Sequence, residues 1–322
     1  MSISRPFALA LLAGGAGAAL PAAAQPRLAA STEPTIVQTG SAVYRFGMFT
    51  AVSHDGQRHY DVTVGIPKRP PPAKGYPVVY LLDGGAAVET LDEGLLKRLD
   101  AGGGPPVLVA IGYVGQPRFD VRARAYDYTP PDPGRPGVVD DQGRPGGGAD
   151  AFLQLLERRI APKAGKLAPI DRRRQTLWGH SYGGLLVLHA AIARAPRFQH
   201  FAAADPALWW NYGSALREAQ GFAAERGGSP RTIDIMVGGN EKRTRDGMPP
   251  GGAAMRTSVP PQAAQALAEQ LRATGNRIRF SRCEGAGHGD MFRISLMRTL
   301  LDTAHSDSDG DAPLSCVVTA GS

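Results

Sequence analysis

Residues 174–190 read RQTLWGHSYGGLLVLHA, and this stretch decides the fold. The apolar run Thr176–Trp178 is typical of a buried strand, and the pattern of Leu185–Ala195 indicates a helix that ends before Pro196. Ser181 lies between the two runs, in a glycine-rich turn. Glycine lets the backbone approach its neighbours where a side chain would collide. The stretch therefore predicts a strand, a tight turn with a serine at its apex, and a helix.

Gly179–Gly183 matches the pattern G-x-S-x-G, which forms a nucleophile elbow when a strand precedes it and a helix follows. Such a turn lifts the serine oxygen out at the carboxyl end of the sheet and points the next amide at a developing oxyanion. We therefore predict that Ser181 is a nucleophile and that the backbone amide of Tyr182 is one oxyanion donor. The alternative is a serine that serves only the turn.

A serine nucleophile needs a neighbouring base, and the chain has seven histidines. His288 lies in the small-residue loop Gly285–Gly289, directly after the last expected strand of the sheet. The chain order Ser, acid, His of such hydrolases makes a late histidine the base. We predict His288 as this base, and the alternative is a solvated loop histidine. The other six are His54, His59, His180, His189, His200 and His305.

The acid that orients the histidine should follow a strand between the serine and the histidine. The run Ile233–Val237 ends in Gly-Gly-Asn, so Glu241 would emerge at the carboxyl edge of the sheet. We predict Glu241 as the acid. Asp205 and Asp246 are rivals, and a serine–histidine pair without a strong third member is a further alternative.

The second oxyanion donor should be a backbone amide just past an earlier central strand. The strand expected at Val78–Leu82 is followed by Asp-Gly-Gly. We predict the amide of Gly85 as this donor, with Gly84 as the next candidate. The assignment rests on position, because Asp-Gly-Gly is by itself only a turn signal.

Strand and helix patterns alternate through most of the chain. Short apolar runs without polar alternation are typical of strands covered on both faces, and repeated strand–helix units predict an α/β fold with a mostly parallel sheet. The first two runs favour an antiparallel opening. The expected strands are Ala42–Ser53, His59–Ile66, Val78–Leu82, Val107–Tyr113, Thr176–Trp178, Phe201–Ala204, Ile233–Val237 and Ile278–Cys283. The expected helices are Val88–Leu99, Ala149–Ile160, Leu185–Ala195, Ser214–Glu225, Pro261–Thr274 and Asp290–Thr303.

Residues 115–148 interrupt this alternation with six prolines and many glycines. A connection this long is uncommon in a compact domain unless it has a function. We expect an excursion over the top of the sheet that forms a wall or lid of a substrate cleft. A loop that only extends into solvent is the alternative.

Residues 1–24 are typical of a secretory signal peptide, with a basic residue, the apolar stretch Phe7–Leu20 and small residues up to Ala24. The apolar stretch is interrupted by glycines and is short for a membrane span of about 20 residues. We expect cleavage after Ala24 and a periplasmic location, with an uncleaved anchor as the alternative. Later segments are too short to span a membrane, and residues 25–322 are expected to form a single α/β domain.

Cys283 and Cys316 are the only two cysteines. In an oxidising compartment they would pair and fix the polar tail, residues 304–322, against the domain. One buried thiol and one thiol on a loose tail fit the sequence equally well, so the pairing stays open. Neither cysteine has a second cysteine or histidine at ligand spacing, which argues against a metal site at either position.

The formal net charge is +7, and the basic residues are scattered without the aromatic-interleaved stripe of a nucleic-acid surface. We therefore expect no nucleic-acid partner. A positive field would help to collect an anionic substrate, and a solvated, arginine-rich surface is the alternative. The sequence leaves the oligomeric state open.

Five motifs occur in order within Val43–Leu301: YLLDG at 80–84, GHSYGG at 179–184, LWW at 208–210, VGGNE at 237–241 and GHG at 287–289. RARAYDYTP at 122–130 and GGADAF at 147–152 fit the same set. The set resembles the putative esterase (esterase D-like) family, and most closely its periplasmic ferric-siderophore trilactone esterases of the enterobactin type. The elbow alone is common to many hydrolases, whereas the ordered set is much narrower.

This resemblance implies an α/β-hydrolase fold, no cofactor and no catalytic metal, and hydrolysis of the ester backbone of a catecholate siderophore. It places Arg122 and Arg124 at the cleft, where guanidinium groups suit an anionic iron–catecholate complex, with iron only as part of the substrate. It also allows Trp209 and Trp210 to offer flat faces to aromatic rings, although packing under a loop is the commoner fate of such a pair. Ala204–Ala207 departs from the family pattern, because serines are expected around its proline.

Two other functions remain open. A general short-chain carboxylesterase or acyltransferase of the same family would keep the chemistry and change the substrate. A non-catalytic periplasmic binding protein for iron complexes would keep the fold, but a binding protein has no use for an elbow serine with a base and an acid.

Overall fold

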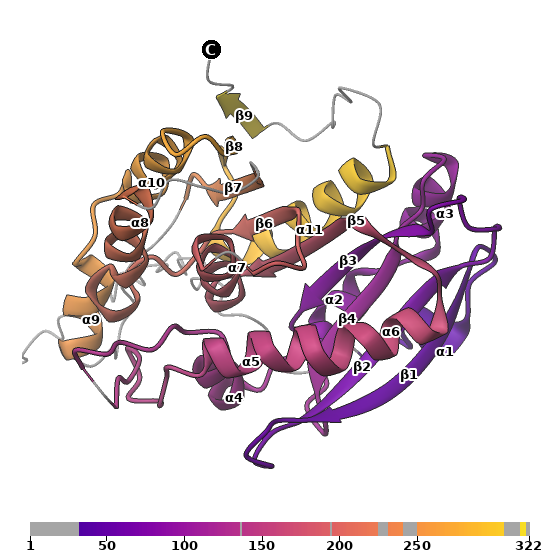
Figure 1. Ribbon diagram of the computed structural model, residues 1–322, viewed down its shortest axis with the longest axis horizontal. Helices are drawn as coiled ribbons and strands as arrows, with labels where there is room; N and C mark the ends of the chain where they lie inside the picture. Colours follow the sequence, from indigo (N-terminus) through magenta and orange to yellow (C-terminus); the bar gives the residue numbers. More distant parts are fainter. Residues whose placement is uncertain are drawn as a thin grey trace, which may run out of the picture.

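A computed structural model describes residues 32–135, 137–193, 195–224, 231–240, 250–305 and 316–319; the expected signal peptide, residues 1–24, lies outside these ranges. One nine-stranded sheet runs through the described chain in the order β1-β2-β4-β3-β5-β6-β7-β8-β9 (Figure 1). The strands are β1 Tyr44–Val52, β2 His59–Pro67, β3 Tyr76–Leu82, β4 Val107–Tyr113, β5 Ile170–His180, β6 His200–Ala204, β7 Thr232–Gly238, β8 Arg277–Cys283 and β9 Cys316–Thr319.

The pairing directions match the expected fold class. Strand β1 pairs antiparallel with β2, and β2 pairs antiparallel with β4. Strands β4, β3, β5, β6, β7 and β8 are parallel neighbours, and β9 adds antiparallel to β8 at the far edge. The predicted mostly parallel sheet with antiparallel N-terminal strands is confirmed, and the arrangement is the α/β-hydrolase fold.

The helices differ from the sequence prediction in detail. They are α1 Ile36–Thr39, α2 Gly84–Thr90, α3 Glu93–Ala101, α4 Val121–Asp127, α5 Ala149–Leu155, the π-helix η1 Leu156–Ile160, α6 Ala161–Leu167, α7 Tyr182–Ile192, the 3₁₀-helix η2 Trp210–Tyr212, α8 Ser214–Ala224, α9 Pro250–Thr257, α10 Ala263–Arg272 and α11 His288–Ala304. The single helix expected at Val88–Leu99 is two, because the Asp92 carboxylate accepts a hydrogen bond from the Leu95 amide and caps α3.

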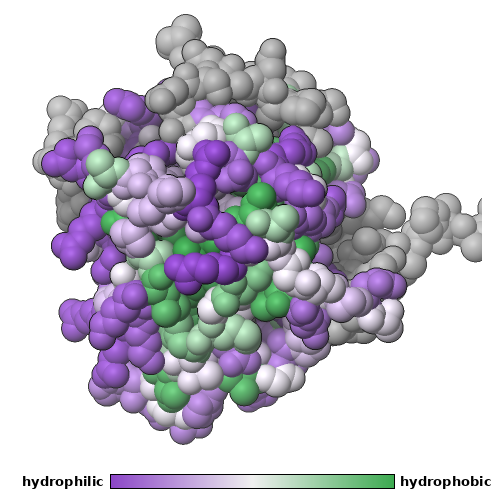
Figure 2. All heavy atoms as spheres, turned by 90° about the vertical axis from the view of Figure 1, so that its right-hand side faces the viewer, coloured by the Kyte–Doolittle hydropathy of each residue, from purple (hydrophilic) through white to green (hydrophobic). Residues whose placement is uncertain are grey.

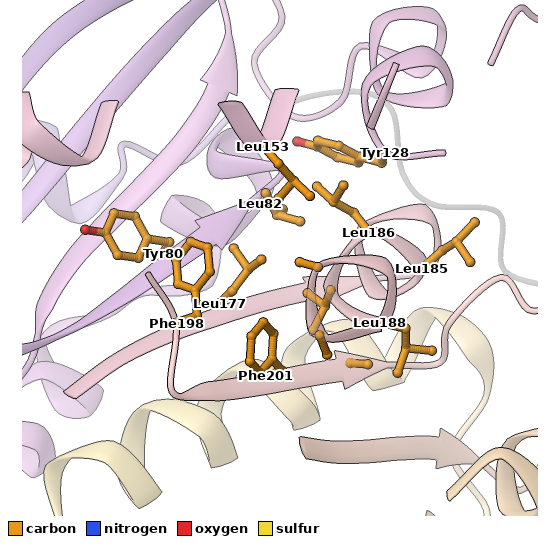
Figure 3. Close-up of a cluster of buried hydrophobic side chains, with 14 of the residues drawn as sticks. Tyr80, Leu82, Tyr128, Leu153, Leu177, Leu185, Leu186, Leu188, Phe198 and Phe201 are labelled. Carbon is orange, nitrogen blue, oxygen red and sulfur yellow. The ribbon is translucent and has the colours of Figure 1, made fainter. Parts of the chain in front are cut away.

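The central strand β3 shows how both faces of the sheet are covered. Val78, Tyr80 and Leu82 point into the core beneath α5, α6, α7 and α10, while Val79 and Leu81 point into the core with α2, α3 and α11. All five side chains are fully buried, which explains the apolar run without polar alternation. Figure 3 shows part of the first of these cores, where Leu82 lies near Leu186 of α7 and Tyr80 packs beside Phe198. Each buried leucine contributes roughly 2 kcal/mol to stability.

The surface gives no sign of a membrane span in the described residues, since no helix there is both long and apolar enough. The face over β1 and α1, at the right of Figure 1, is mostly hydrophilic around a central apolar area (Figure 2). Met48 on the edge strand β1 is 65 % exposed. Single exposed apolar side chains of this kind are common on protein surfaces.

Cys283 and Cys316 form a disulfide bond, which answers the question that the sequence left open. Cys283 is the last residue of β8 and Cys316 is the first residue of β9, and the two residues are also paired in the sheet. The bond therefore holds the C-terminal strand to the sheet just before the loop that leads to His288.

His189 on α7 carries an ionic contact that joins three helices. It is 6 % exposed, and its Nδ1 and Nε2 lie 2.7 Å from Glu218 Oε1 of α8 and 2.8 Å from Asp150 Oδ1 of α5. Burial alone would lower the pKa of His189, but the two carboxylates outweigh it and raise the pKa to about 9. The protonated imidazole donates to both acceptors.

This cluster predicts a fall in stability in mild alkali. A folded pKa of about 9 above the ordinary value of 6.5 means that the contribution is complete below pH 6.5 and is lost as the pH rises to 9. Because the Asp150 side chain is exposed to solvent, which weakens the pair, we expect a loss of about 2 kcal/mol in the free energy of unfolding, measured by urea denaturation at pH 6.5 and pH 9. In His189→Gln the difference between the two pH values should shrink by the same amount. An unchanged difference in this variant would contradict the assignment.

Candidate active site

The turn between β5 and α7 has the geometry of a nucleophile elbow. Ser181 has φ 60° and ψ −116°, a conformation that a residue with a side chain holds only when its surroundings enforce it. Its amide donates a 2.9 Å hydrogen bond to the Ala204 carbonyl at the end of β6. A Cβ on Gly179 would lie 2.5 Å from the carbonyl carbon of Gly183, so the turn closes only with glycine at that position. The expected strand, turn and helix are present, with Ser181 at the apex.

His288 is the first residue of α11 and follows the loop Glu284–Gly287 after β8. Its Nδ1 lies 2.8 Å from Oδ2 of Asp205. Because a carboxylate oxygen only accepts, Nδ1 carries the proton and donates it. Nε2 is then the basic nitrogen, as a general base requires. The ring centroid of His288 is 4.5 Å from that of His180, the residue before the serine, so the histidine lies beside the elbow.

The carboxylate that His288 contacts is not the one predicted from the sequence. Asp205 directly follows β6, is buried, and also accepts a hydrogen bond from the Gly238 amide at 3.3 Å. Glu241, the predicted acid, and its rival Asp246 both lie outside the described residues. Asp205, the other rival, is thus the carboxylate that the structure joins to the histidine. The signal for it in the sequence was an aspartate before a proline, where the family resemblance leads us to expect serine.

The two predicted oxyanion donors have different surroundings. Tyr182 begins α7, and the first amides of a helix have no partner within it. Gly85 lies in the first turn of α2, where an added Cβ would meet the Pro117 carbonyl oxygen at 2.1 Å, and its amide nitrogen lies close to Gly112 of β4. Strands β4 and β5 flank β3 on opposite sides, and Ser181 follows β5. The contact of Gly85 with β4 therefore lies on the side of β3 away from Ser181. The role of Gly85 stays a prediction.

The two arginines assigned to the cleft lie on α4, a helix that the sequence analysis missed although the Asp120 carboxylate caps it. The Arg124 guanidinium donates two 2.8 Å hydrogen bonds to Asp83 and a 3.3 Å bond to the His180 carbonyl. Its side chain is only 12 % exposed, so Arg124 does not face solvent and instead holds the residue before Ser181 through the His180 carbonyl. Arg122 is exposed and lines a cavity of about 560 Å³ together with Arg58 and other residues.

The tryptophan pair packs mainly under the loop, as the alternative interpretation held. Trp210 is fully buried, and a Cβ on Gly146 would lie 2.3 Å from its ring, so it offers no face to a substrate in this structure. Trp209 is 7 % exposed and lines a cavity of about 350 Å³ that also reaches Asp205. Of the two predicted aromatic platforms, Trp209 lines this cavity and Trp210 is fully buried.

The proline-rich excursion is fixed to the elbow by buried charges. Asp140 and Asp141 have fully buried side chains, and the Tyr182 hydroxyl donates to both, at 3.1 and 3.3 Å. Arg144 pairs with Asp140, and Arg256 of α9 pairs with Asp141, each at 2.6 Å. Burial and the two carboxylates raise the pKa of Tyr182, which keeps its hydroxyl protonated and able to donate. This part of the excursion is therefore an ordered wall beside Ser181's helix, not a solvent loop.

Comparison with known proteins identifies the family. The sequence model of the putative esterase family matches residues 53–303. Ferri-bacillibactin esterase BesA of Bacillus subtilis is 30 % identical over 267 residues, which cover 79 % of this chain and 88 % of BesA. The apo-salmochelin esterase of Escherichia coli O6:H1 is 44 % identical over 185 residues, 57 % of this chain, and the match spans 58 % of the length of that protein.

Solved structures agree with the sequence comparison. The enterobactin and salmochelin hydrolase IroE superposes with a TM-score of 0.68 at 35 % identity, covering 84 % of this chain and 99 % of that one. Siderophore hydrolase EstB of Aspergillus nidulans superposes with a TM-score of 0.67 at 27 % identity, covering 81 % of this chain and 96 % of its own. Both the family match and the similarity to BesA extend over most of the chain, and the chain belongs to the putative esterase family of α/β hydrolases.

Proposed function

We propose that this protein is a serine esterase that hydrolyses the trilactone backbone of a catecholate siderophore, or of its ferric complex. The observation that carries the proposal is the 2.8 Å hydrogen bond between His288 and the buried Asp205, beside a serine held in an elbow conformation. A structural turn serine requires no such pair. The names of the relatives, esterases of salmochelin, bacillibactin and enterobactin, support the substrate class.

The residues define the steps. Asp205 holds the Nδ1–H tautomer of His288, so Nε2 accepts the Ser181 proton while the serine oxygen attacks the ester carbonyl. The Tyr182 amide and a second amide stabilise the oxyanion of the tetrahedral intermediate. The alcohol leaves with the proton from the histidine, and a water activated by the same histidine then cleaves the acyl-enzyme.

The proposed chemistry uses side chains and backbone amides of the protein, and iron enters only with the substrate. His180, Asp205 and His288 bring three donor atoms within 4.8 Å of one another, a spacing that a metal ion could bridge. Two of these residues are already joined by the hydrogen bond that His288 needs as a base. A metal at this cluster would therefore compete with the proposed reaction.

The charge of the chain and its disulfide support the expected substrate and location. Exposed Arg122 lines a cavity at the carboxyl edge of β4, where its guanidinium group would meet a catecholate anion. Arg58 lines the same cavity, but its guanidinium group already donates to Asp55 and Asp127. The bond between Cys283 and Cys316 is of a kind that persists in oxidising compartments, which supports export by residues 1–24 to the periplasm.

Ser181→Ala should lower the rate of ester cleavage by at least about 10⁴-fold, because the nucleophile is lost. The measurement is mass spectrometry of a catecholate trilactone, iron-free and iron-loaded, after incubation with enzyme, with exposed Ser258→Ala as control. Linear trimer, dimer or monomer made by the wild type and not by Ser181→Ala is the expected result. An intact trilactone beside rapid cleavage of a nitrophenyl ester would move the function to a general carboxylesterase.

Asp205→Asn should lower kcat by about 10³-fold with little change in KM, because an amide favours the wrong tautomer of the histidine. The matched control is Glu241→Gln, which we expect to stay within about threefold of the wild type. Steady-state kinetics on the same ester compares the two variants. The reverse ranking would transfer the acid role to Glu241, and full activity in both would favour a serine–histidine pair.

Arg256→Ala should lower the free energy of unfolding by about 2 kcal/mol, because it leaves the buried Asp141 carboxylate without its nearer guanidinium partner and with only Arg144, at 3.9 Å. We also expect the variant to raise KM more for the trilactone than for a small ester. The reason is that α9 and the excursion would no longer be held together as a wall that contacts the larger substrate. Exposed Arg172→Ala is the control for loss of one positive charge. Equal effects of the two variants on KM and stability would argue against the wall.

A further inference from the structure

His180, the residue before the elbow serine, has a buried imidazole to which the proposed chemistry gives no role. It is the last residue of β5 and is 5 % exposed. Its Nε2 lies 2.8 Å from the main-chain oxygen of His288, and its ring lies against the rings of His288 and Phe292, with centroids 4.5 and 5.6 Å away. The side chain thus connects the elbow to the start of α11, which carries the proposed base.

The protonation state of His180 follows from its surroundings. Burial, with smaller effects of His288 and Arg124, lowers the pKa of His180 well below its ordinary value. The ring is therefore neutral and has one N–H group. Because the main-chain oxygen of His288 only accepts, that proton lies on Nε2 and is donated to the carbonyl. A neutral ring also avoids placing a positive charge beside the imidazolium that forms on His288 during the reaction.

The hydrogen bond from His180 to the main chain of His288 joins two segments that are each fixed by further hydrogen bonds. The His180 carbonyl accepts a bond from Arg124, which is itself fixed by two bonds to Asp83. At the other end, the Ala286 carbonyl accepts from the Asn240 amide at 3.1 Å, which fixes the loop two residues before His288. The main chain of His288 is thus located by His180, while its ring is located by Asp205.

We propose that His180 is a positioning residue for His288. Its imidazole N–H, bonded to the main-chain oxygen of His288, sets the distance between the elbow and the base. The proposal rests on the proposed roles of Ser181 and His288. It assigns His180 no contact with the substrate. The effect should therefore fall on the chemical step and not on substrate binding.

The test compares His180→Phe, which keeps a planar ring without a donor, with His180→Gln, which can donate. We expect kcat of His180→Phe to fall about tenfold with KM within about twofold, the loss that corresponds to one hydrogen bond. His180→Gln should recover most of the rate. Active sites are counted by stoichiometric reaction with an organophosphate, so a misfolded fraction does not lower the measured kcat. His189→Gln is the matched control, because it removes another buried histidine and should lower stability while leaving kcat unchanged.

A double variant gives a second readout that a merely structural role would not affect. If His180 and Asp205 both position His288, the loss in His180→Phe combined with Asp205→Asn should be smaller than the product of the two separate losses. Multiplicative losses, a rate in His180→Phe equal to wild type, or an equal loss in Phe and Gln variants would each overturn the proposal. Full activity in Ser181→Ala would instead overturn the proposed function itself, whatever His180 does.

Discussion

The close approach of the end of β5 to the first turn of α7 is the constraint on which the site depends. Ser181 has a positive φ with a strongly negative ψ, and such a backbone conformation persists only where neighbouring structure enforces it. The bond from its amide to β6 and the contact between Gly179 and Gly183 supply that enforcement at the turn. Behind them, two cores on opposite faces of a parallel sheet keep the strand ends in register. The same sheet edge brings Asp205 and His288 to the serine, because carboxyl ends of parallel strands meet there.

Buried charges organise the surroundings of this edge, and two of the buried carboxylates are paired with arginines. Asp83 is paired with Arg124 below the elbow, and Asp141 is paired with Arg256 beside it. An unpaired buried charge would cost several kcal/mol, so these pairs fix where the excursion and α9 can lie. Ion pairs thus determine where the excursion and α9 lie beside the site, whereas close contacts between backbone atoms determine the shape of the elbow. The two constraints meet at Tyr182, whose main chain belongs to the elbow and whose hydroxyl belongs to the ionic network.

Local patterns in the sequence predicted the fold class, the elbow and the place of His288 soon after β8, because apolar periodicity and glycine spacing act over a few residues. The expected loop around His288 extended too far, since His288 is the first residue of α11. Glu241 was chosen by its place after β7, whereas the contact of Asp205 with His288 joins residues 83 positions apart and leaves no local trace. Arg124 was expected at the cleft from its family motif, but its long-range partner Asp83 decides where it points. Trp210 is buried for the same reason: the excursion that covers it is distant in sequence. Helix α4 was missed because prolines around it outweighed its Asp120 cap.

The disulfide between Cys283 and Cys316 turns the end of the chain into a closed covalent ring. His288 and all of α11 lie inside this ring, whose ends are 33 residues apart in sequence. In the unfolded chain a closed loop of this length loses conformational freedom equivalent to about 4 kcal/mol. A single break in the backbone between the two cysteines would leave both pieces attached to the sheet. The proposed base would thus remain tethered to its domain after a cut that would release an ordinary C-terminal tail.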